Sequence, residues 1–242
     1  MSLLVLVYHR ARPGWDGNSA EVLDAHFRHI AARCRNVLPG EPIEAESLNV
    51  CLSFDDGYFD FYAVVFPLLR RYGLRALLAV APAVLREETD RSGAERLAVP
   101  TEIAFARTQL GGLCTWPELQ VMAESGHVAV AAHGYTHVSI DSPEVDLNTE
   151  VRLPKMVLTS RLDTRVESFV FPYGRFCRRA LREARLAYRH VFRLGGASNI
   201  DWNGGLLYRV CADATSGLEQ LFSPGRMAAY RARFLWNRIR RR

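Results

Sequence analysis

The 242-residue sequence predicts a single α/β domain built on parallel strands. Three observations indicate this fold class. Short apolar runs alternate with stretches of helical spacing, the connections between them are short, and the runs are apolar on both faces, as buried strands are. Such alternation implies parallel strands joined by right-handed crossovers. The pattern itself is compatible with both a nearly complete (β/α) barrel and a doubly wound open sheet.

The expected strands are short and bounded by polar residues, glycine or proline. In chain order they are Leu3–Tyr8, Val50–Phe54, Ala76–Ala81, Val128–Ala131, Phe169–Phe171, His190–Phe192 and Tyr208–Cys211. The expected helices place apolar residues three and four positions apart, over Leu23–Cys34, Tyr58–Tyr72, Pro117–Glu124, Val145–Leu162 and Cys177–Ala187. Thr115 is the expected N-cap of the third helix, and Gly126 its stop signal.

Residues 83–112 form a long irregular connection that is rich in charge and ends in two glycines. Connections of this length in compact domains often serve as lids or binding loops. The alternative is a surface excursion that contains a short helix at Thr101–Arg107. The sequence does not decide between these two interpretations.

The composition is that of a globular protein, with 49% hydrophobic and 24% charged residues. The net charge of +5 is unevenly placed, because seven of the 31 basic residues and no acidic residue lie in 226–242. The rest of the chain therefore carries 24 basic against 26 acidic residues, and no nucleic-acid partner is expected for it. Without an apolar run near the roughly 18 residues of a membrane span, or an export signal, the sequence predicts a cytoplasmic protein.

Three polar clusters directly follow expected strands. The first is Ser53-Phe54-Asp55-Asp56-Gly57. Two adjacent carboxylates are costly to bury together unless a cation lies between them. One aspartate would then bind a metal ion while the other serves as a base. The alternative is an ordinary turn, for which Asp-Asp-Gly is a common sequence.

The second cluster is His133-Gly134-Tyr135-Thr136-His137. This spacing puts both imidazoles on one side of a tight turn, so both can reach the same ion. With Asp56 they would supply three ligands and leave a position open, as in catalytic zinc sites. Two histidines and one carboxylate also suit non-haem iron, so the ligand types leave the metal undecided.

The third cluster runs from Phe169 to Gly174 and contains Pro172-Tyr173-Gly174. Proline and glycine hold Tyr173 on a turn, where its backbone N–H is able to face a developing oxyanion. Taken alone, this is a generic strand exit.

In this order, the three motifs resemble those of the polysaccharide deacetylase family (carbohydrate esterase family 4). The likeness includes the Thr115–Leu119 run and extends over roughly residues 48–176. It implies a distorted (β/α) barrel of about seven parallel strands and metal-dependent removal of an acetyl group, usually from an N-acetylated hexosamine. By this match Asp55 is the base and Tyr173 supplies the oxyanion N–H. The ligands would be Asp56, His133 and His137, with Zn²⁺ as the expected ion and cobalt, nickel, manganese or iron as alternatives.

Two departures separate the chain from the better-known branch of this family. Val170 stands where that branch has an arginine beside the base, and no histidine after His190 supplies the late Leu-x-His acid. A second, permuted branch has its acid in an N-terminal Tyr-His motif, which Tyr8-His9 resembles. The resemblance implies that His9 is the general acid, whereas a lone histidine at a strand end is otherwise structural or exposed.

The missing arginine has a candidate replacement in Arg209, at the start of the last expected strand. The alternative for Arg209 is a surface charge. Trp202, in the polar loop Asn199–Gly205, is a candidate for stacking on a sugar face, and Tyr8 and Pro172 are further candidates for substrate contact.

The activity expected from these residues is hydrolysis of an N-acetyl group on a sugar. The alternatives are an O-deacetylase, an amidase acting on another acyl substrate, and a non-catalytic carbohydrate-binding relative. The absence of an export signal favours a nucleotide- or lipid-linked sugar precursor over a cell-wall polymer as the substrate.

We expect the barrel to occupy residues 1–225 and a basic, helical tail to occupy 226–242. Helical spacing places Met227, Tyr230 and Phe234 on one face of this tail, with Arg231 and Arg238 close to it. A terminal helix that packs its aromatic residues on the barrel is one interpretation. Reversible attachment to an anionic membrane surface is the other, with nucleic-acid binding as a third.

Overall fold

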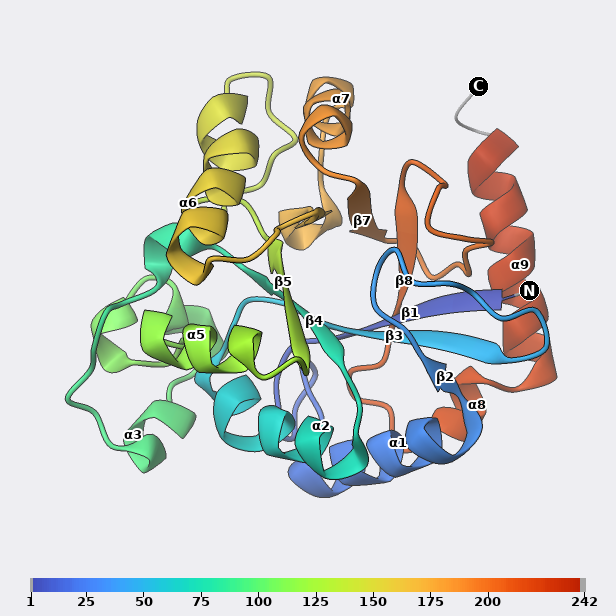
Figure 1. Cartoon of the computed structure of the whole chain (residues 1–242), viewed down its shortest axis with the longest axis horizontal. Coiled ribbons are helices and arrows are strands. Elements are labelled where there is room, and N and C mark those ends of the chain that lie inside the picture. Colours follow the sequence, from blue (N-terminus) through green and yellow to red (C-terminus); the bar gives the residue numbers. More distant parts are fainter. Residues whose placement is uncertain (1, 240–242) are drawn as a thin grey trace.

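The computed structural model describes residues 2–239, so Met1 and the tail residues Arg240, Arg241 and Arg242 lie outside the described part. Within residues 2–239, seven parallel strands form a closed barrel (Figure 1). They are β1 (Ser2–Tyr8), β3 (Leu48–Phe54), β4 (Ala76–Val80), β5 (Val128–Ala132), β6 (Ser168–Val170), β7 (His190–Leu194) and β8 (Leu207–Cys211). Pairing of β1 with β3, from Ser2 opposite Leu48 to Tyr8 opposite Phe54, closes the ring. The predicted distorted (β/α) barrel is therefore confirmed, and the open sheet is excluded.

Each expected strand is present within two residues of its predicted ends. One further strand was not predicted, β2 (Arg35–Asn36), which pairs with the start of β3. A strand of two residues is too short to show a hydrophobic period, so the sequence pattern does not reveal it.

The strands place their side chains alternately inside and outside the barrel. Leu3, Val5 and Cys51 belong to the cluster that fills its interior. Their neighbours Leu4 and Leu6 belong to the larger cluster under the surrounding helices. Burial on both sides explains why these strands read as continuous apolar runs.

Helices surround the barrel on the outside (Figure 1). Following the chain, the longer ones before the tail are α1 (Ala20–Arg33), α2 (Phe66–Tyr72), α5 (Trp116–Glu124), α6 (Leu153–Leu162) and α7 (Arg178–Ala187). The predicted N-cap of α5 is confirmed, because the Thr115 hydroxyl accepts a hydrogen bond from the Glu118 N–H.

Two of these helices begin with a wider, π-helical turn, over Phe61–Val65 before α2 and Asn148–Arg152 before α6. Pro67 and Pro154 follow these turns and lack the N–H that an α-helical bond needs. The regular helices therefore start later than the spacing predicts.

Residues 83–112 fold back on the barrel as two short helices, α3 (Gly93–Leu97) and α4 (Thr101–Ala104), followed by a 3₁₀ turn. The α4 helix ends earlier than the predicted Thr101–Arg107. Arg96 anchors the segment, donating to the Gly111 carbonyl at 2.8 Å and to both Glu118 oxygens at 2.6 and 2.8 Å. Its guanidinium also covers the Phe59 ring at 3.5 Å. The segment is thus tied to the barrel by a buried arginine.

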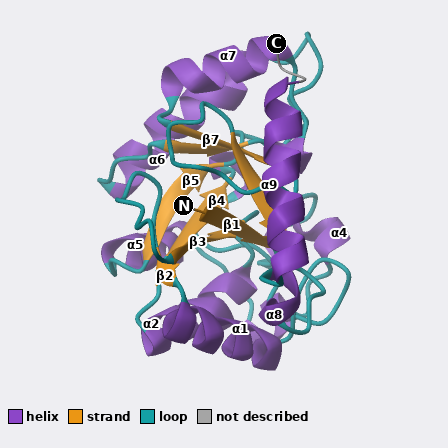
Figure 2. Ribbon diagram, turned by 90° about the vertical axis from the view of Figure 1, so that its right-hand side faces the viewer, coloured by secondary structure: helices purple, strands orange, loops and turns teal. Residues whose placement is uncertain are grey.

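The chain ends in α8 (Leu218–Leu221) and α9 (Pro224–Ile239), and α9 runs along one side of the molecule (Figure 2). Tyr230 of this helix is buried, and the ring of its Phe234 meets the Tyr208 ring of β8 edge-on at 6.2 Å. No helix within residues 2–239 is long and apolar enough to span a bilayer. The division into 1–225 and 226–242 stays a prediction.

Candidate active site

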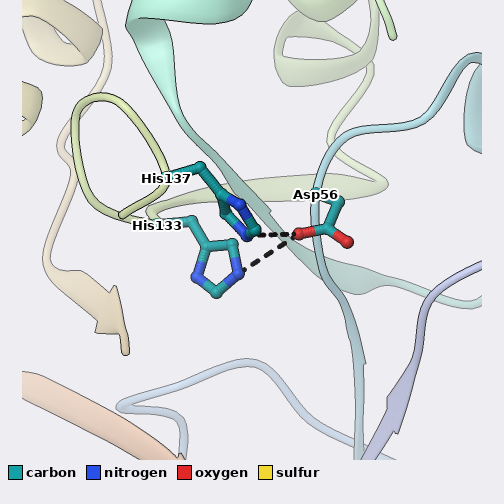
Figure 3. A group of neighbouring side chains, drawn as sticks. All are labelled: Asp56, His133 and His137. Atoms are coloured by element: carbon teal, nitrogen blue, oxygen red, sulfur yellow. Dashed lines mark ion pairs between the residues drawn. The ribbon is translucent and has the colours of Figure 1, made fainter. Parts of the chain in front are cut away.

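The carboxyl ends of β3 and β5 bring together an aspartate and two histidines. The Asp56 Oδ1 atom lies 2.9 Å from His137 Nε2 and 3.4 Å from His133 Nε2 (Figure 3). Asp56 and His137 both adopt left-handed backbone conformations, with φ of 75° and 63°. Such conformations cost free energy in residues other than glycine and persist where the surrounding structure enforces them. The two turns therefore hold these side chains toward one point.

The imidazole rings are oriented by contacts on their far side. His133 Nδ1–H donates to the Val170 carbonyl at 2.9 Å, and this contact turns Nε2 toward Asp56. His137 Nδ1 lies 3.2 Å from the Tyr173 hydroxyl. Burial raises the pKa of the Asp56 carboxyl, but its hydrogen bonds with the two histidines outweigh this and hold the pKa well below the ordinary value. Two imidazole nitrogens and an ionised carboxylate are a donor set that suits a divalent cation.

The neighbouring carboxylate has a different partner. Arg209 donates to both oxygens of Asp55, at 2.6 and 2.8 Å, and also to the Ser53 hydroxyl at 3.0 Å. Arg209 is 1% exposed and Asp55 4%, so Arg209 is not a surface charge. Burial raises the pKa of Asp55, but the charges of Arg209 and His133 together lower it by more than burial raises it. The pKa is therefore below its ordinary value, and the carboxylate stays ionised.

His9 lies on the other side of Asp55, at the end of β1. Its Nε2 is 3.8 Å from Asp55 Oδ2, and its Nδ1 is 2.6 Å from Asp213 Oδ2. Burial lowers the pKa of His9, but the Asp213 hydrogen bond and the charges of Asp55 and Asp56 raise it to about 9. At 28% exposure the ring is accessible from solvent. A protonated imidazole thus stands beside an ionised carboxylate.

The family of this chain follows from a match that covers most of the barrel. The family model for polysaccharide deacetylase matches residues 44–191, which is more than half of the sequence. The chain belongs to the polysaccharide deacetylase family. No curated protein sequence matches it.

Solved structures of similar fold accompany this match. A de-N-acetylase from Aggregatibacter actinomycetemcomitans is 20% identical with a TM-score of 0.72, covering 92% of this chain and 99% of its own. IcaB from Ammonifex degensii is 20% identical with a TM-score of 0.69, covering 89% and 93%. The deacetylase PplD from Streptococcus pyogenes is 19% identical with a TM-score of 0.72, covering 92% and 97%. At these identities the likeness shows the fold alone.

Three supporting residues of this deacetylase-family site were not found from the sequence. Asp213, which orients His9, lies two residues after the end of β8, and this position near a strand end is the signal that could have indicated it. Glu150 accepts from the backbone N–H groups of Tyr135 and Thr136 at 2.9 and 3.2 Å and so holds the His133–His137 loop. No local pattern marks Glu150.

The third unpredicted residue is Phe105, which comes from the 83–112 segment. Its ring stacks on His137, with 4.1 Å between ring centroids and 19° between planes. Phe105 also meets the Tyr58 ring edge-on at 6.1 Å. Just upstream, the Thr101 hydroxyl accepts from Arg10 at 3.0 Å and donates to Asp16 at 2.6 Å. The segment therefore reaches the site and covers one ligand.

The three expected substrate-contact residues are placed differently by the structure. Tyr8 is fully buried, stacks on Phe54 and has its hydroxyl 3.3 Å from His26 Nδ1, so it is a core residue. Pro172 is also buried and packs beside Gly134. The structure contradicts substrate contact for Tyr8, whereas for Pro172 it stays a prediction. The outward side chain of this turn is Tyr173, which is 59% exposed.

The prediction that Trp202 contacts substrate is wrong, because Trp202 lies at the amino end of the barrel, opposite to the candidate site. It is 6% exposed and belongs to the interior cluster with Leu3. Its indole N–H donates to the Glu41 carbonyl at 2.9 Å, and its ring meets His190, the first residue of β7, at 5.9 Å. An aromatic ring that closes the amino end of the barrel is more stable there than exposed in a loop.

Proposed function

We propose that this deacetylase-family member is a metal-dependent hydrolase that removes the acetyl group from an N-acetylated sugar. One observation carries the proposal: two adjacent buried carboxylates have separate partners. Asp55 is held by the Arg209 fork, whereas Asp56 faces the Nε2 atoms of both histidines. This separation matches a division of labour between a base and a metal ligand.

Asp56, His133 and His137 would hold a divalent cation, with zinc as the expected ion. When bound there, such a cation polarises an acyl carbonyl and lowers the pKa of water toward about 7. The donor set supports this assignment, because the three ligand atoms lie within 4.8 Å of one another.

The protein's own groups then account for both proton transfers. Asp55 takes a proton from the water whose oxygen attacks the acetyl carbonyl carbon. Tyr173 lies on a left-handed turn with φ of 57°, and its backbone N–H would donate to the oxyanion. His9, protonated at neutral pH, gives its proton to the amide nitrogen as the C–N bond breaks. Acetate and the free amino sugar are the products.

The test is acetate release from a panel of N-acetylated oligosaccharides and of nucleotide- and lipid-linked sugars, with and without a chelator. We expect turnover that the chelator abolishes and that zinc restores. Asp55→Asn should lose turnover but keep the ion in elemental analysis, whereas Asp56→Asn and His133→Ala should lose both. Turnover that resists chelation, or near-normal kcat in Asp55→Asn, contradicts the proposal. Release from O-acetylated sugars alone would assign the O-deacetylase alternative.

The substrate and location of the enzyme are part of the same proposal. The carbohydrate would be a polysaccharide, an oligosaccharide or a lipid- or nucleotide-linked precursor. A cytoplasmic location, with peripheral contact to an anionic membrane through residues 226–242, likewise stays a proposal.

A further inference from the structure

Helix α9 has two apolar faces instead of one. Its inner face consists of Met227, Tyr230 and Phe234, at the i, i+3, i+7 spacing of one helix stripe. Tyr230 is 5% exposed and its carbonyl accepts from Ser198 N–H, while Phe234 packs on β8. This inner face satisfies the expectation of a terminal helix packed on the barrel.

The outer face of α9 is also apolar. Ala228, Ala232, Leu235 and Ile239 follow one another at spacings of four, three and four residues, with Trp236 beside them. Leu235 is 59% exposed, Trp236 55% and Ile239 67%. A helix that only covers a barrel normally turns a polar face to solvent. Contiguous exposed apolar side chains on a helix instead mark an interaction site.

Arginines border this outer stripe on both sides. Helical spacing puts Arg231 and Arg238 along one border and Arg226 and Arg233 along the other. No acidic residue follows Glu219, whereas the chain before residue 226 has more acidic than basic residues. Arg233 donates to the Gly196 carbonyl at 3.4 Å and the Arg238 guanidinium lies 5.8 Å from the centre of the Phe234 ring, while both side chains remain exposed beside the stripe.

We propose that the outer face of α9, defined by Ala228, Ala232, Leu235, Trp236 and Ile239, docks on an anionic membrane surface. The helix would lie in the plane of the interface, with this stripe among the acyl chains and the bordering arginines at the headgroups. Because α9 packs on the barrel through its other face, docking needs no unfolding of the helix. This inference rests on the membrane contact proposed above and names the surface that makes it, and it does not depend on the proposed hydrolysis.

The charge pattern favours a membrane over a second copy of the chain. Two copies joined through this stripe would bring arginine borders of like charge together, with no acidic residue on the helix to pair with them. Anionic headgroups supply the missing negative charge without such repulsion.

The test is co-sedimentation of the full chain with vesicles. We expect binding to vesicles of equal parts phosphatidylcholine and phosphatidylglycerol, little binding to phosphatidylcholine alone, and weakening by salt. Leu235→Ser/Trp236→Ser/Ile239→Ser should lower the partition coefficient about 100-fold or more. Arg231→Gln/Arg238→Gln should lower it about 30-fold.

Matched controls remove the same chemistry elsewhere on the surface. Met156→Ser/Leu186→Ser deletes side chains that are 68% and 71% exposed, and Arg178→Gln/Arg182→Gln deletes two exposed arginines of α7. These controls should bind as the wild type does. The thermal midpoint of each variant is measured alongside, so that loss of binding is distinguished from loss of folding.

Three results would overturn the proposal. They are equal binding to both vesicle types, full binding by the triple serine variant, and loss of binding in the controls. Sedimentation equilibrium adds a fourth: a dimer without lipid that the triple serine variant abolishes would assign the stripe to a second copy. Acetate release without vesicles is measured in parallel, so that failure of docking and failure of the proposed hydrolysis are told apart.

Discussion

His9 and Asp213 are joined by two hydrogen bonds across the seam between the first and last strands. His9 Nδ1 lies 2.6 Å from Asp213 Oδ2, and the backbone N–H of His9 donates to Asp213 Oδ1 at 3.0 Å. Because both carboxylate oxygens of Asp213 contact His9, the plane of the imidazole is fixed and its Nε2 is directed toward Asp55. This pair therefore joins the first and last strands of the barrel at His9, the residue assigned to the acid step of the proposed reaction.

Replacing Asp213 by asparagine should move the alkaline limb of the kcat/KM–pH profile to lower pH. A general acid works only when protonated, so activity falls as pH rises through the pKa of His9, about 9 in the wild type. Without the Asp213 charge, that pKa falls toward its ordinary 6.5. Asp201→Asn, an exposed change at the far end of the barrel, should leave the limb in place. An unmoved limb in Asp213→Asn would show that His9 is not the titrating acid.

Removing the His9 imidazole should affect amide and ester substrates differently. An amine leaves only when protonated, so His9→Ala should slow amide hydrolysis roughly 10²–10⁴-fold. An aryl ester has a leaving group that hardly needs a proton, and its hydrolysis should slow much less. Both rates are measured on one preparation with its ion content checked. Equal losses on the two substrates would point to a structural role for His9.

Arg209→Met should destabilise the fold and abolish turnover, because it leaves the Asp55 carboxylate buried without a partner. Loss of one member of a buried ion pair costs about 3–5 kcal/mol of unfolding free energy. Asp55→Asn/Arg209→Met should regain part of this stability, since no unpaired charge remains, yet it should stay inactive. Chemical denaturation of the wild type, the two single variants Asp55→Asn and Arg209→Met, and the double variant gives the four free energies of unfolding that this comparison needs. A double variant no more stable than Arg209→Met would mean that packing, not charge, sets the cost.

Much of this architecture could be predicted because parallel strands bring their carboxyl ends to one edge. The three motifs each follow a strand, so Asp56, His133 and His137 converge in the structure as their positions indicate. Closure of the barrel was harder to predict from the sequence, because it rests on pairing between β1 and β3, which a hydrophobic period does not reveal. There the family resemblance decided the architecture.

The unpredicted parts of the site depend on contacts between distant segments. Asp213 meets His9 across 204 positions, and Glu150 holds a loop 14 residues before it. The strand-end position marks Asp213 as polar and near the site, but no local pattern indicates the partner of either residue. Trp202 shows the reverse error. Its loop is polar in sequence, but the ring turns inward to close the barrel. Burial of single aromatic residues is decided by tertiary packing, which composition does not report.

Replacing Phe105 by alanine should weaken metal binding and turnover together. Its ring stacks on His137, whose Nδ1 also lies 3.2 Å from the Tyr173 hydroxyl, so the two contacts together restrict the imidazole. Partners that orient a ligand without touching the ion typically contribute 10–100-fold to metal affinity or activity. Phe105→Ala should therefore lower zinc affinity about tenfold, measured by competition with a chromogenic chelator, and lower kcat/KM for the acetylated sugar. Phe105→Tyr should restore both, because it keeps the stacked ring.

Ile103→Ala is the matched control, since Ile103 lies on α4, whose C-cap is Phe105, and packs against the same small cluster. It removes apolar contact without touching the His137 ring. If loosening of the 83–112 segment were the cause, Ile103→Ala would lower zinc affinity as Phe105→Ala does. We expect instead that Ile103→Ala lowers the thermal midpoint while zinc affinity stays at the wild-type value, so that the effect follows the stacked ring and not the stability of the segment that carries it.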